Sequence, residues 1–265
     1  MRRLLRTLLF FVWLLQSIQV SAQSGFSTGL DDSVINIPCS KTCYDLSLQI
    51  PHLKSTKDYL VSAIPYTPFA YTTPGGNEVS NIYGDDLYSS VIPMPFNFCF
   101  YDSVFSELVI SSNGLVTFEK AVANCVATFS VLNPLPYAAG TPCLRTSAYY
   151  PRSSIMAVFS DLDLRLAASP ADRKVEWRVE GTAPFRRFIV SYYHVGLFEG
   201  DCGTPNTFQI VLYETSGVID IYIEQKACSS SSSSGKSIMG LQNWAKDKAV
   251  IVPGKNSVEI GRAHV

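Results

Sequence analysis

Two pairs of aspartates have the spacing best suited to metal chemistry. Asp161 and Asp163 are separated by one residue directly after the most apolar run of the sequence, Ile155–Phe159, and Asp85 and Asp86 are adjacent. Carboxylates at positions i and i+2 of a strand end can share Ca²⁺, which prefers oxygen ligands. Asp85 and Asp86 would add oxygens if the loops meet. The same side chains are also typical of turns, where they accept backbone N–H groups. Calcium binding at Asp161 and Asp163 and a structural role are both open, and no other cofactor is expected.

The remaining residue patterns do not indicate catalysis. His52 and His194 do not have the spacing of zinc ligands, and we expect His194 to be packed or hydrogen-bonded in a strand. The sequence lacks a Gly-x-Ser-x-Gly elbow for a nucleophilic serine. A carboxylate pair for glycoside hydrolysis depends on a distance in three dimensions, so the sequence leaves that possibility open. We expect a protein that is not an enzyme.

Aromatic residues offer a second kind of site, a surface that contacts a sugar ring or a protein partner. Trp177 alternates in phase with Val175 and Val179, a pattern typical of a buried strand face. Trp244 instead follows an apolar run, Ile238–Gln242, in a polar stretch. We therefore expect Trp177 in the core and Trp244 as the candidate ligand contact.

Short β-strands must position these residues, because no segment of twelve or more residues after the first 22 shows helical periodicity. Asn113-Gly114 between β-branched runs is a strong hairpin signal, and the excursion 122–148 is expected to be a covering loop. The expected strands are Leu46–Ile50, Tyr59–Ile64, Tyr66–Tyr71, Ser90–Phe100, Leu108–Ile110, Leu115–Phe118, Ile155–Phe159, Lys174–Glu180, Arg187–Tyr193, Thr207–Glu214, Val218–Gln225 and Ile238–Gln242. This pattern predicts an all-β fold, an antiparallel β-sandwich with long covering loops.

The N-terminus has the features of an export signal. Arg2, Arg3 and Arg6 precede the apolar run Leu8–Leu15, and small residues follow at Val20-Ser21-Ala22. The apolar run is shorter than the ~20 residues that span a bilayer. We expect residues 1–22 to be a signal peptide, the mature protein to be secreted or on the cell surface, and no segment to span a membrane.

Export makes disulfides the expected fate of the cysteines, which are Cys39, Cys43, Cys99, Cys125, Cys143, Cys202 and Cys228. Cys202 and Cys228 lie near the open end of the hairpin predicted around Thr215-Ser216-Gly217, within reach of each other. Cys125 and Cys143 would close a loop of plausible size. The count is odd, so one thiol is free or has its partner outside this chain.

The composition limits the classes of partner. With 47% hydrophobic and 16% charged residues, the chain has ample apolar surface for a core and too little charge for disorder. A formal net charge of -1 excludes nucleic-acid binding that depends on bulk positive charge. We expect an extracellular protein or a glycan as partner and no nucleic acid.

Several short phrases occur in a fixed order along the chain. Asp85-Asp86 is followed by Met94–Tyr101, Val109–Phe118, Ser160–Asp163, Gly181–Phe188, Phe208–Thr215 and Ile238–Asn243. Together these phrases resemble the N-terminal extracellular module of Bacteroidota surface proteins that carry gliding-motility-associated or type IX secretion domains at their C-termini. They are more distantly similar to the nidogen extracellular (NIDO) domain. The resemblance implies a bacterial, non-catalytic role at the cell surface or in the matrix, and it transfers no catalytic residues.

The resemblance also sets the expected domain boundaries. In such modules the chain continues past a segment like Pro253–Asn256 into a closing strand, which we expect to be missing here. Residues 259–265 resemble the translation of a sequencing adaptor. We therefore expect a flexible lead over residues 23–45 and a NIDO-like sandwich over residues 46–258, truncated at its C-terminus.

The expected function is a non-catalytic extracellular binding or adhesion module at the N-terminus of a larger protein. Two alternatives remain open. The domain could be an accessory part of an exported hydrolase, or it could be a carbohydrate-binding module that acts alone. Exposed loops on a β scaffold would serve any of these roles.

Overall fold

The structure is a computed structural model that describes residues 56–145, 148–200, 204–228 and 235–259. These residues belong to one compact unit, Leu53–Val265. The expected signal peptide, the lead over residues 23–45 and the strand expected at Leu46–Ile50 lie outside the described residues.

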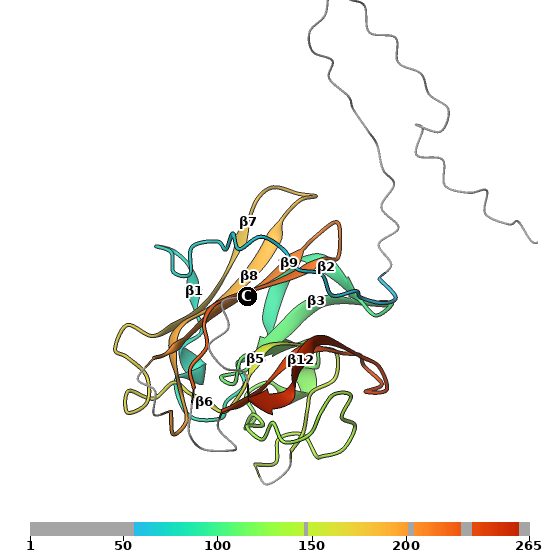
Figure 1. The fold of residues 1–265 in the computed structure, drawn as a ribbon. Coiled ribbons are helices and arrows are strands. Elements are labelled where there is room, and N and C mark those ends of the chain that lie inside the picture. The colour runs from blue at the N-terminus through green and yellow to red at the C-terminus, as the bar shows by residue number, and fades with distance from the viewer. Residues whose placement is uncertain (1–55, 146–147, 201–203, 229–234, 260–265) are drawn as a thin grey trace, which may run out of the picture. The chain divides into compact units, whose positions relative to one another are not determined.

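Two antiparallel sheets form the domain (Figure 1). The first sheet has the order β1-β7-β8-β9-β10, and the short strand β6 pairs with β8 off this path. Its strands are β1 (Asn77–Glu78), β6 (Leu162–Asp163), β7 (Lys174–Glu180), β8 (Arg187–Leu197), β9 (Asn206–Tyr213) and β10 (Ile219–Gln225). β7 and the β9–β10 hairpin confirm the strands that the alternating patterns predict, and β8 is longer than expected.

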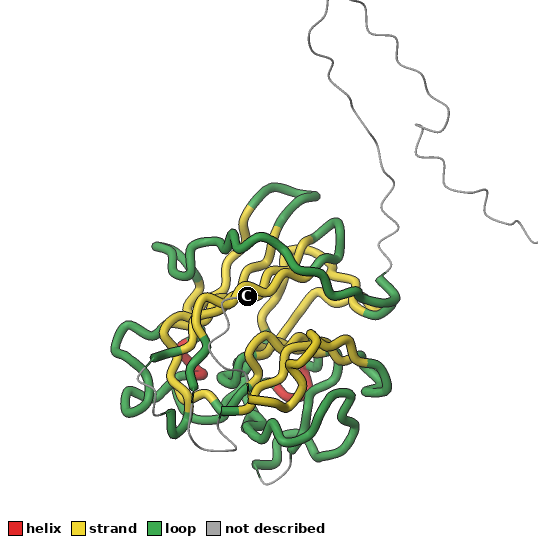
Figure 2. Tube along the Cα trace, in the orientation of Figure 1, coloured by secondary structure: helices red, strands yellow, loops and turns green. Residues whose placement is uncertain are grey.

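The second sheet has the order β12-β11-β5-β4-β3-β2. Its strands are β2 (Ile92–Phe100), β3 (Ser103–Ile110), β4 (Leu115–Thr117), β5 (Ser154–Phe159), β11 (Lys236–Gln242) and β12 (Ala249–Glu259). The described helical segments are two short 3-10 turns, η1 (Ser80–Ile82) and η2 (Lys120–Val122), and Figure 2 shows how little helix accompanies the strands. No helix in the described residues is long and apolar enough to cross a membrane.

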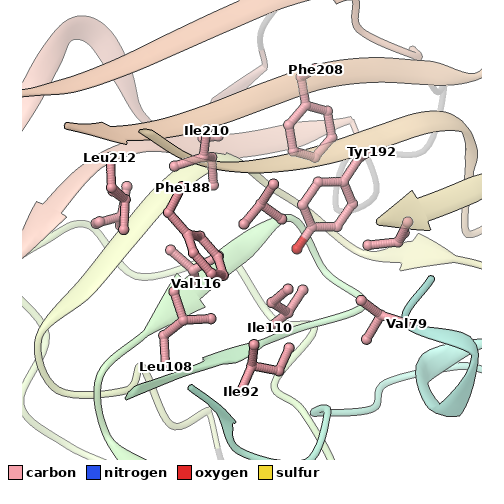
Figure 3. Close-up of a cluster of buried hydrophobic side chains, with 14 of the residues drawn as sticks. Val79, Ile92, Leu108, Ile110, Val116, Phe188, Tyr192, Phe208, Ile210 and Leu212 are labelled. Atoms are coloured by element: carbon pink, nitrogen blue, oxygen red, sulfur yellow. The ribbon is translucent and has the colours of Figure 1, made fainter. Parts of the chain in front are cut away.

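The main core lies between the two sheets. Leu108, Ile110 and Val116 of the second sheet face Phe188, Tyr192 and Phe208 of the first (Figure 3), and all six side chains are fully buried. The one polar group among them is satisfied across the core, because the Tyr192 hydroxyl donates to the Ser111 carbonyl at 2.7 Å. Trp177 is partly buried and stacks on Phe188 with ring centroids 5.1 Å apart, so it packs against this core.

β5 is buried on both faces, as its wholly apolar sequence predicts. Ile155 and Ala157 belong to the main core, whereas Met156 and Phe159 belong to a second apolar cluster on the other side of the sheet. Residues 123–153 supply much of that second cluster and contain no strand in their described part. In Figure 1 they form the green and yellow-green loops next to β5 and β12. The covering loop predicted at 122–148 is therefore confirmed.

Two expected strands are wrong. Residues 59–64 and 66–71 form no strand, because Pro65 and Pro68 lack the N–H groups that a sheet ladder needs. The second of these segments lies against the outer face of the first sheet instead, where the Phe69 N–H donates to Gln209 Oε1 at 3.0 Å. At the other end of the domain, Pro253–Asn256 lies within the edge strand β12.

Candidate functional site

Three loops that are far apart in the sequence meet around one buried side chain, Asn113. The Asn113 amide donates to Asp86 Oδ1 and to the Thr128 carbonyl, both at 2.9 Å. Its oxygen accepts the Leu162 N–H at 3.0 Å. Asn113 is fully buried, so each of these bonds replaces a bond to water that folding removes. One side chain therefore fixes the loop before β2, the covering loop and the β5–β6 junction relative to the β3–β4 turn.

The β3–β4 turn adopts its geometry because of the residue after Asn113. Gly114 has a φ of +80°, and a Cβ there would overlap the Val158 carbonyl. Only glycine fits both the left-handed backbone and this close approach. The adjacent Ser112 hydroxyl accepts the Leu87 N–H at 2.9 Å, which ties the turn to the Asp85–Asp86 loop a second time.

An acidic cluster lies at this junction. One carboxylate oxygen each from Asp85, Asp86 and Asp161 lie within 4.8 Å of one another. Asp85 also forms an isolated antiparallel bridge with Asp163. The loops that the sequence places 75 residues apart thus bring their carboxylates together, as the calcium interpretation requires.

Two arginines partly neutralise the cluster. Arg165 holds the Asp163 carboxylate with its Nε at 2.9 and 3.0 Å from the two oxygens, and its Nη2 lies 3.3 Å from Asp85 Oδ2. Arg145 Nη1 lies 3.1 Å from Asp86 Oδ2. If all are ionised, the three carboxylates of the cluster, the neighbouring Asp163 and the two guanidinium groups carry two formal negative charges in total.

The electrostatics of the cluster disfavour the charged form of its acids. Burial, with added repulsion from Asp86 and Asp85, raises the pKa of Asp161 from 3.8 to about 8. Burial also raises the pKa of Asp86 to about 6, against the lowering effect of the Asn113 hydrogen bond. The pKa of Asp85 rises for the same reason, although Arg165 opposes the shift.

The donor set fits a hard divalent cation. Asp85 Oδ1 is buried without a hydrogen-bond partner, and the Asp161 carboxylate has no hydrogen bond or ion pair to another described residue. A cation of charge +2 would favour the ionised form of these acids, against the burial and the mutual repulsion that raise their pKa values. Ca²⁺ takes 6–8 oxygen ligands, so carbonyls or water would complete the set.

The two aspartates singled out from the sequence therefore have different surroundings. Asp161 belongs to the cluster, whereas the Asp163 carboxylate is engaged by Arg165 and is almost fully buried. Sequence reasoning treated Asn113 only as a turn residue and did not identify Arg145 or Arg165. For Arg165, the i, i+2 spacing from Asp163 was the available signal, because such residues share one side of an extended segment.

One predicted disulfide is present. Cys125 and Cys143 are bonded, with their Cα atoms 4.9 Å apart, and the bond closes part of the covering loop. Cys228 is also disulfide-bonded, but its expected partner, Cys202, lies outside the described residues, so that pairing stays a prediction. Cys99 is free in the structure.

Trp244 lies in the turn between β11 and β12 with 49% of its surface exposed. The Arg152 guanidinium is 5.8 Å from the centroid of its ring, and Arg152 Nη1 donates to the Trp244 carbonyl at 2.9 Å. The structure thus places Trp244 where a ligand could reach it, as the polar surroundings in the sequence predict.

Lys246, two residues later in the same turn, is buried instead. Its amine lies 3.5 Å from the centroid of the Tyr149 ring and has no hydrogen-bond partner in the described residues. Burial lowers the pKa of Lys246 from 10.5 to about 8, although the nearby Glu119 opposes the shift. His194 is hydrogen-bonded through Nδ1 to Asp172 at 2.8 Å, which agrees with the hydrogen-bonded strand residue that the sequence predicts.

Comparison with protein-family models gives one match for this chain. The family model described as NIDO related matches residues 58–258, which is more than half of the chain and nearly all of the described sandwich. Comparison with curated proteins and with solved structures gives no significant match. The phrases that meet at Asn113 and at the acidic cluster lie inside the matched range. The chain belongs to the NIDO-related family.

Proposed function

We propose that this domain is an extracellular binding module without chemistry of its own. The observation that carries the proposal is that the polar side chains at the loop junction bind neighbouring parts of the domain. The Asn113 side chain is hydrogen-bonded to the loops around it, and Arg165 forms an ion pair with Asp163. These groups fix the loops of a β scaffold, as is typical of domains that bind through loops.

We also propose that the acidic cluster binds Ca²⁺ and that the ion holds the loop junction together. The unpartnered Oδ1 of Asp85 and the unpaired carboxylate of Asp161 support this proposal. Extracellular modules commonly bind Ca²⁺ with a Kd of about 10⁻⁴–10⁻³ M. At about 1 mM Ca²⁺, a site in this range would be roughly half to nine-tenths filled.

The family and the N-terminal sequence both support an extracellular location. A NIDO-related domain is an extracellular module, and the first 22 residues have the pattern of a secretory signal. We propose a bacterial protein that is secreted or held at the cell surface as the N-terminal part of a larger chain. The resemblance to modules of proteins with type IX secretion or gliding-motility domains supports this context.

Trp244 favours a second candidate function, carbohydrate binding. A half-exposed indole can stack on a sugar ring, and Arg152 beside it could bond to hydroxyl or carboxylate groups of a glycan. No comparable side chain in the described residues supports the other alternative, an accessory domain of an exported hydrolase.

The experiment is a binding screen with the purified mature chain. The protein is immobilised, and extracellular-matrix proteins, bacterial surface proteins and a glycan array are applied with calcium present. We expect saturable binding to at least one protein or glycan. Loss of glycan binding in Trp244→Ala, with protein binding retained, would favour the carbohydrate function, and Phe185→Ala, another exposed aromatic, is the matched control. Binding to none of these surfaces would contradict the proposal.

A further inference from the structure

A large apolar groove in the described residues lies between the two sheets of the sandwich at one side. It has a volume of about 750 Å³ and runs between β10 of the first sheet and β11 and β12 of the second. It is remote in sequence from the acidic cluster and shares none of that cluster's residues. Neither the calcium proposal nor the Trp244 site accounts for it.

The walls of the groove are core side chains that lack a covering layer. Ile219, Ile221 and Ile223 alternate along β10 and face inward, where they pack on the main core but stay partly exposed. Leu241 and Val250 line the opposite wall. Exposed apolar area of this kind on a soluble domain marks a binding surface.

Residues 60–65, at the rim of the groove, also expose apolar side chains. Leu60 is 92% exposed, and Val61 and Ile64 are 40% and 43% exposed. Within the described part of the chain, residues 60–65 make no hydrogen bond to any other residue. A largely apolar segment thus lies beside the groove, and its backbone has no hydrogen-bond partner in the described part of the chain.

The backbone beside the groove has a free sheet edge. β10 pairs with β9 along one edge, and no described strand pairs with its other edge. A free edge offers a row of N–H and C=O groups to an added strand. The side chains of such a strand would alternate, so that every second one would enter the groove.

The charges indicate the chemistry of the occupant. Asp58 and Asp220 are the acidic residues of the groove, and no lysine, arginine or histidine lines it. The Asp220 carboxylate alternates with the isoleucines of β10, and its Oδ2 accepts the hydroxyls of Tyr213 and Tyr222 at 2.7 and 3.2 Å. Two carboxylates favour a basic partner and disfavour the headgroup of a fatty acid. An acyl chain would also leave the free edge of β10 unused.

We propose that this groove binds an extended polypeptide segment of another protein, which adds to the edge of β10. The segment carries apolar side chains at alternate positions and a lysine or arginine that reaches Asp58 or Asp220. The seven residues of β10 span about 23 Å, so a segment of seven to nine residues covers the edge. The proposal goes beyond the proposed function because it names a partner class for a separate surface.

The test uses a fluorescein-labelled peptide in which four valines alternate with threonines between terminal lysines. Its binding to the full mature chain is measured by fluorescence anisotropy. We expect saturable binding that weakens by about tenfold or more when alternate backbone nitrogens are methylated, because two lost hydrogen bonds of about 1 kcal/mol each have that effect. Ile221→Lys should weaken binding as strongly. Val104→Lys, at an exposed valine in β3 outside the groove, should not.

A second variant keeps the test decisive if Ile221→Lys does not fold. Asp220→Asn should weaken the lysine-ended peptide but not a version with terminal glutamines. Equal binding of the methylated and unmethylated peptides would overturn the proposal. So would competition by dodecanoate without loss of binding in Asp220→Asn, self-association of the chain through the groove, or no peptide binding at all. These outcomes are separate from the glycan arm of the earlier screen, because that arm depends on Trp244, which does not line the groove.

Discussion

Removal of the Asn113 side chain should destabilise the domain more than removal of any exposed asparagine. Asn113→Ala deletes bonds to Asp86, to the Thr128 carbonyl and from the Leu162 N–H, and all of these groups lie in a junction that water does not reach. A hydrogen bond to a charged group contributes about 1.5–3 kcal/mol, and a buried group left unpaired costs about 1–3 kcal/mol. The sum is about 4 kcal/mol of lost unfolding free energy.

The assay is urea unfolding followed by tryptophan fluorescence, with thermal unfolding by circular dichroism as a second measurement. For a domain of this size, 1 kcal/mol shifts the melting temperature by about 2–4 °C, so we expect a fall of roughly 8–16 °C. Asn243→Ala is the matched control. The Asn243 side chain also makes three hydrogen bonds, to Asp247 and Lys248, but it does so in an exposed turn.

The control should lose about 1 kcal/mol or less, because its partners can bond to water instead. A loss below about 1 kcal/mol in Asn113→Ala, or equal losses in the two variants, would refute the reasoning. In that case the loops would not depend on Asn113 for their arrangement.

Two other substitutions test the physical account of the fold. Gly114→Ala should abolish soluble expression, because the added Cβ would overlap the Val158 carbonyl and the φ of this position is unfavourable for alanine. Gly75→Ala is the control: its φ is +97° but the space around it is open, so it should lower the unfolding free energy by only about 1 kcal/mol. Lys246→Met should stabilise the domain at pH 7, because it removes a buried charged amine. The pKa shift of Lys246 from 10.5 to about 8 corresponds to a cost of roughly 3 kcal/mol for keeping that amine charged in the folded state. This cost exceeds the ~0.5–2 kcal/mol that the contact with the Tyr149 ring contributes. The wild-type chain regains this energy as pH rises from 8 to 10.5, so in parallel urea titrations the advantage of Lys246→Met should shrink over that range. An advantage independent of pH would contradict the assigned cause.

Local patterns in the sequence predicted much of the fold. The alternation in Lys174–Glu180 corresponds to β7 without a shift at either end, and the Asn113-Gly114 signal corresponds to the turn between β3 and β4. The apolar run at 155–159 correctly indicated a strand buried on both faces. These features depend on side-chain periodicity and on glycine backbone geometry, which act over a few residues.

The candidate site could be predicted only in part, because it depends on contacts between distant segments. The sequence indicated that Asp161 could meet Asp85 and Asp86. The local feature that sets Asp163 apart from Asp161 is Arg165, two residues after it, and only the structure shows that Arg165 occupies the Asp163 carboxylate. The burial of Lys246 under Tyr149 was equally hidden, since a polar turn normally faces water.

The open groove was missed for a related reason. Residues 59–64 have β-type composition, and a strand there would have covered part of the β10 edge. Pro65 and Pro68 prevent continued pairing, and the segment instead borders a groove that the sequence alone does not reveal.

The central claim is that Asp85, Asp86 and Asp161 form one cation site at the meeting point of three loops. The most direct test is a calorimetric titration of the metal-stripped mature chain with Ca²⁺, paired with melting temperatures at about 1 mM Ca²⁺ and in chelator. We predict one binding event with a rise in melting temperature in the wild-type chain. Asp161→Asn should lose both responses, and Glu224→Gln, at an exposed carboxylate on β10, should keep them. The absence of Ca²⁺ heat and of a thermal shift in the wild-type chain, or an undiminished response in Asp161→Asn, would contradict the claim.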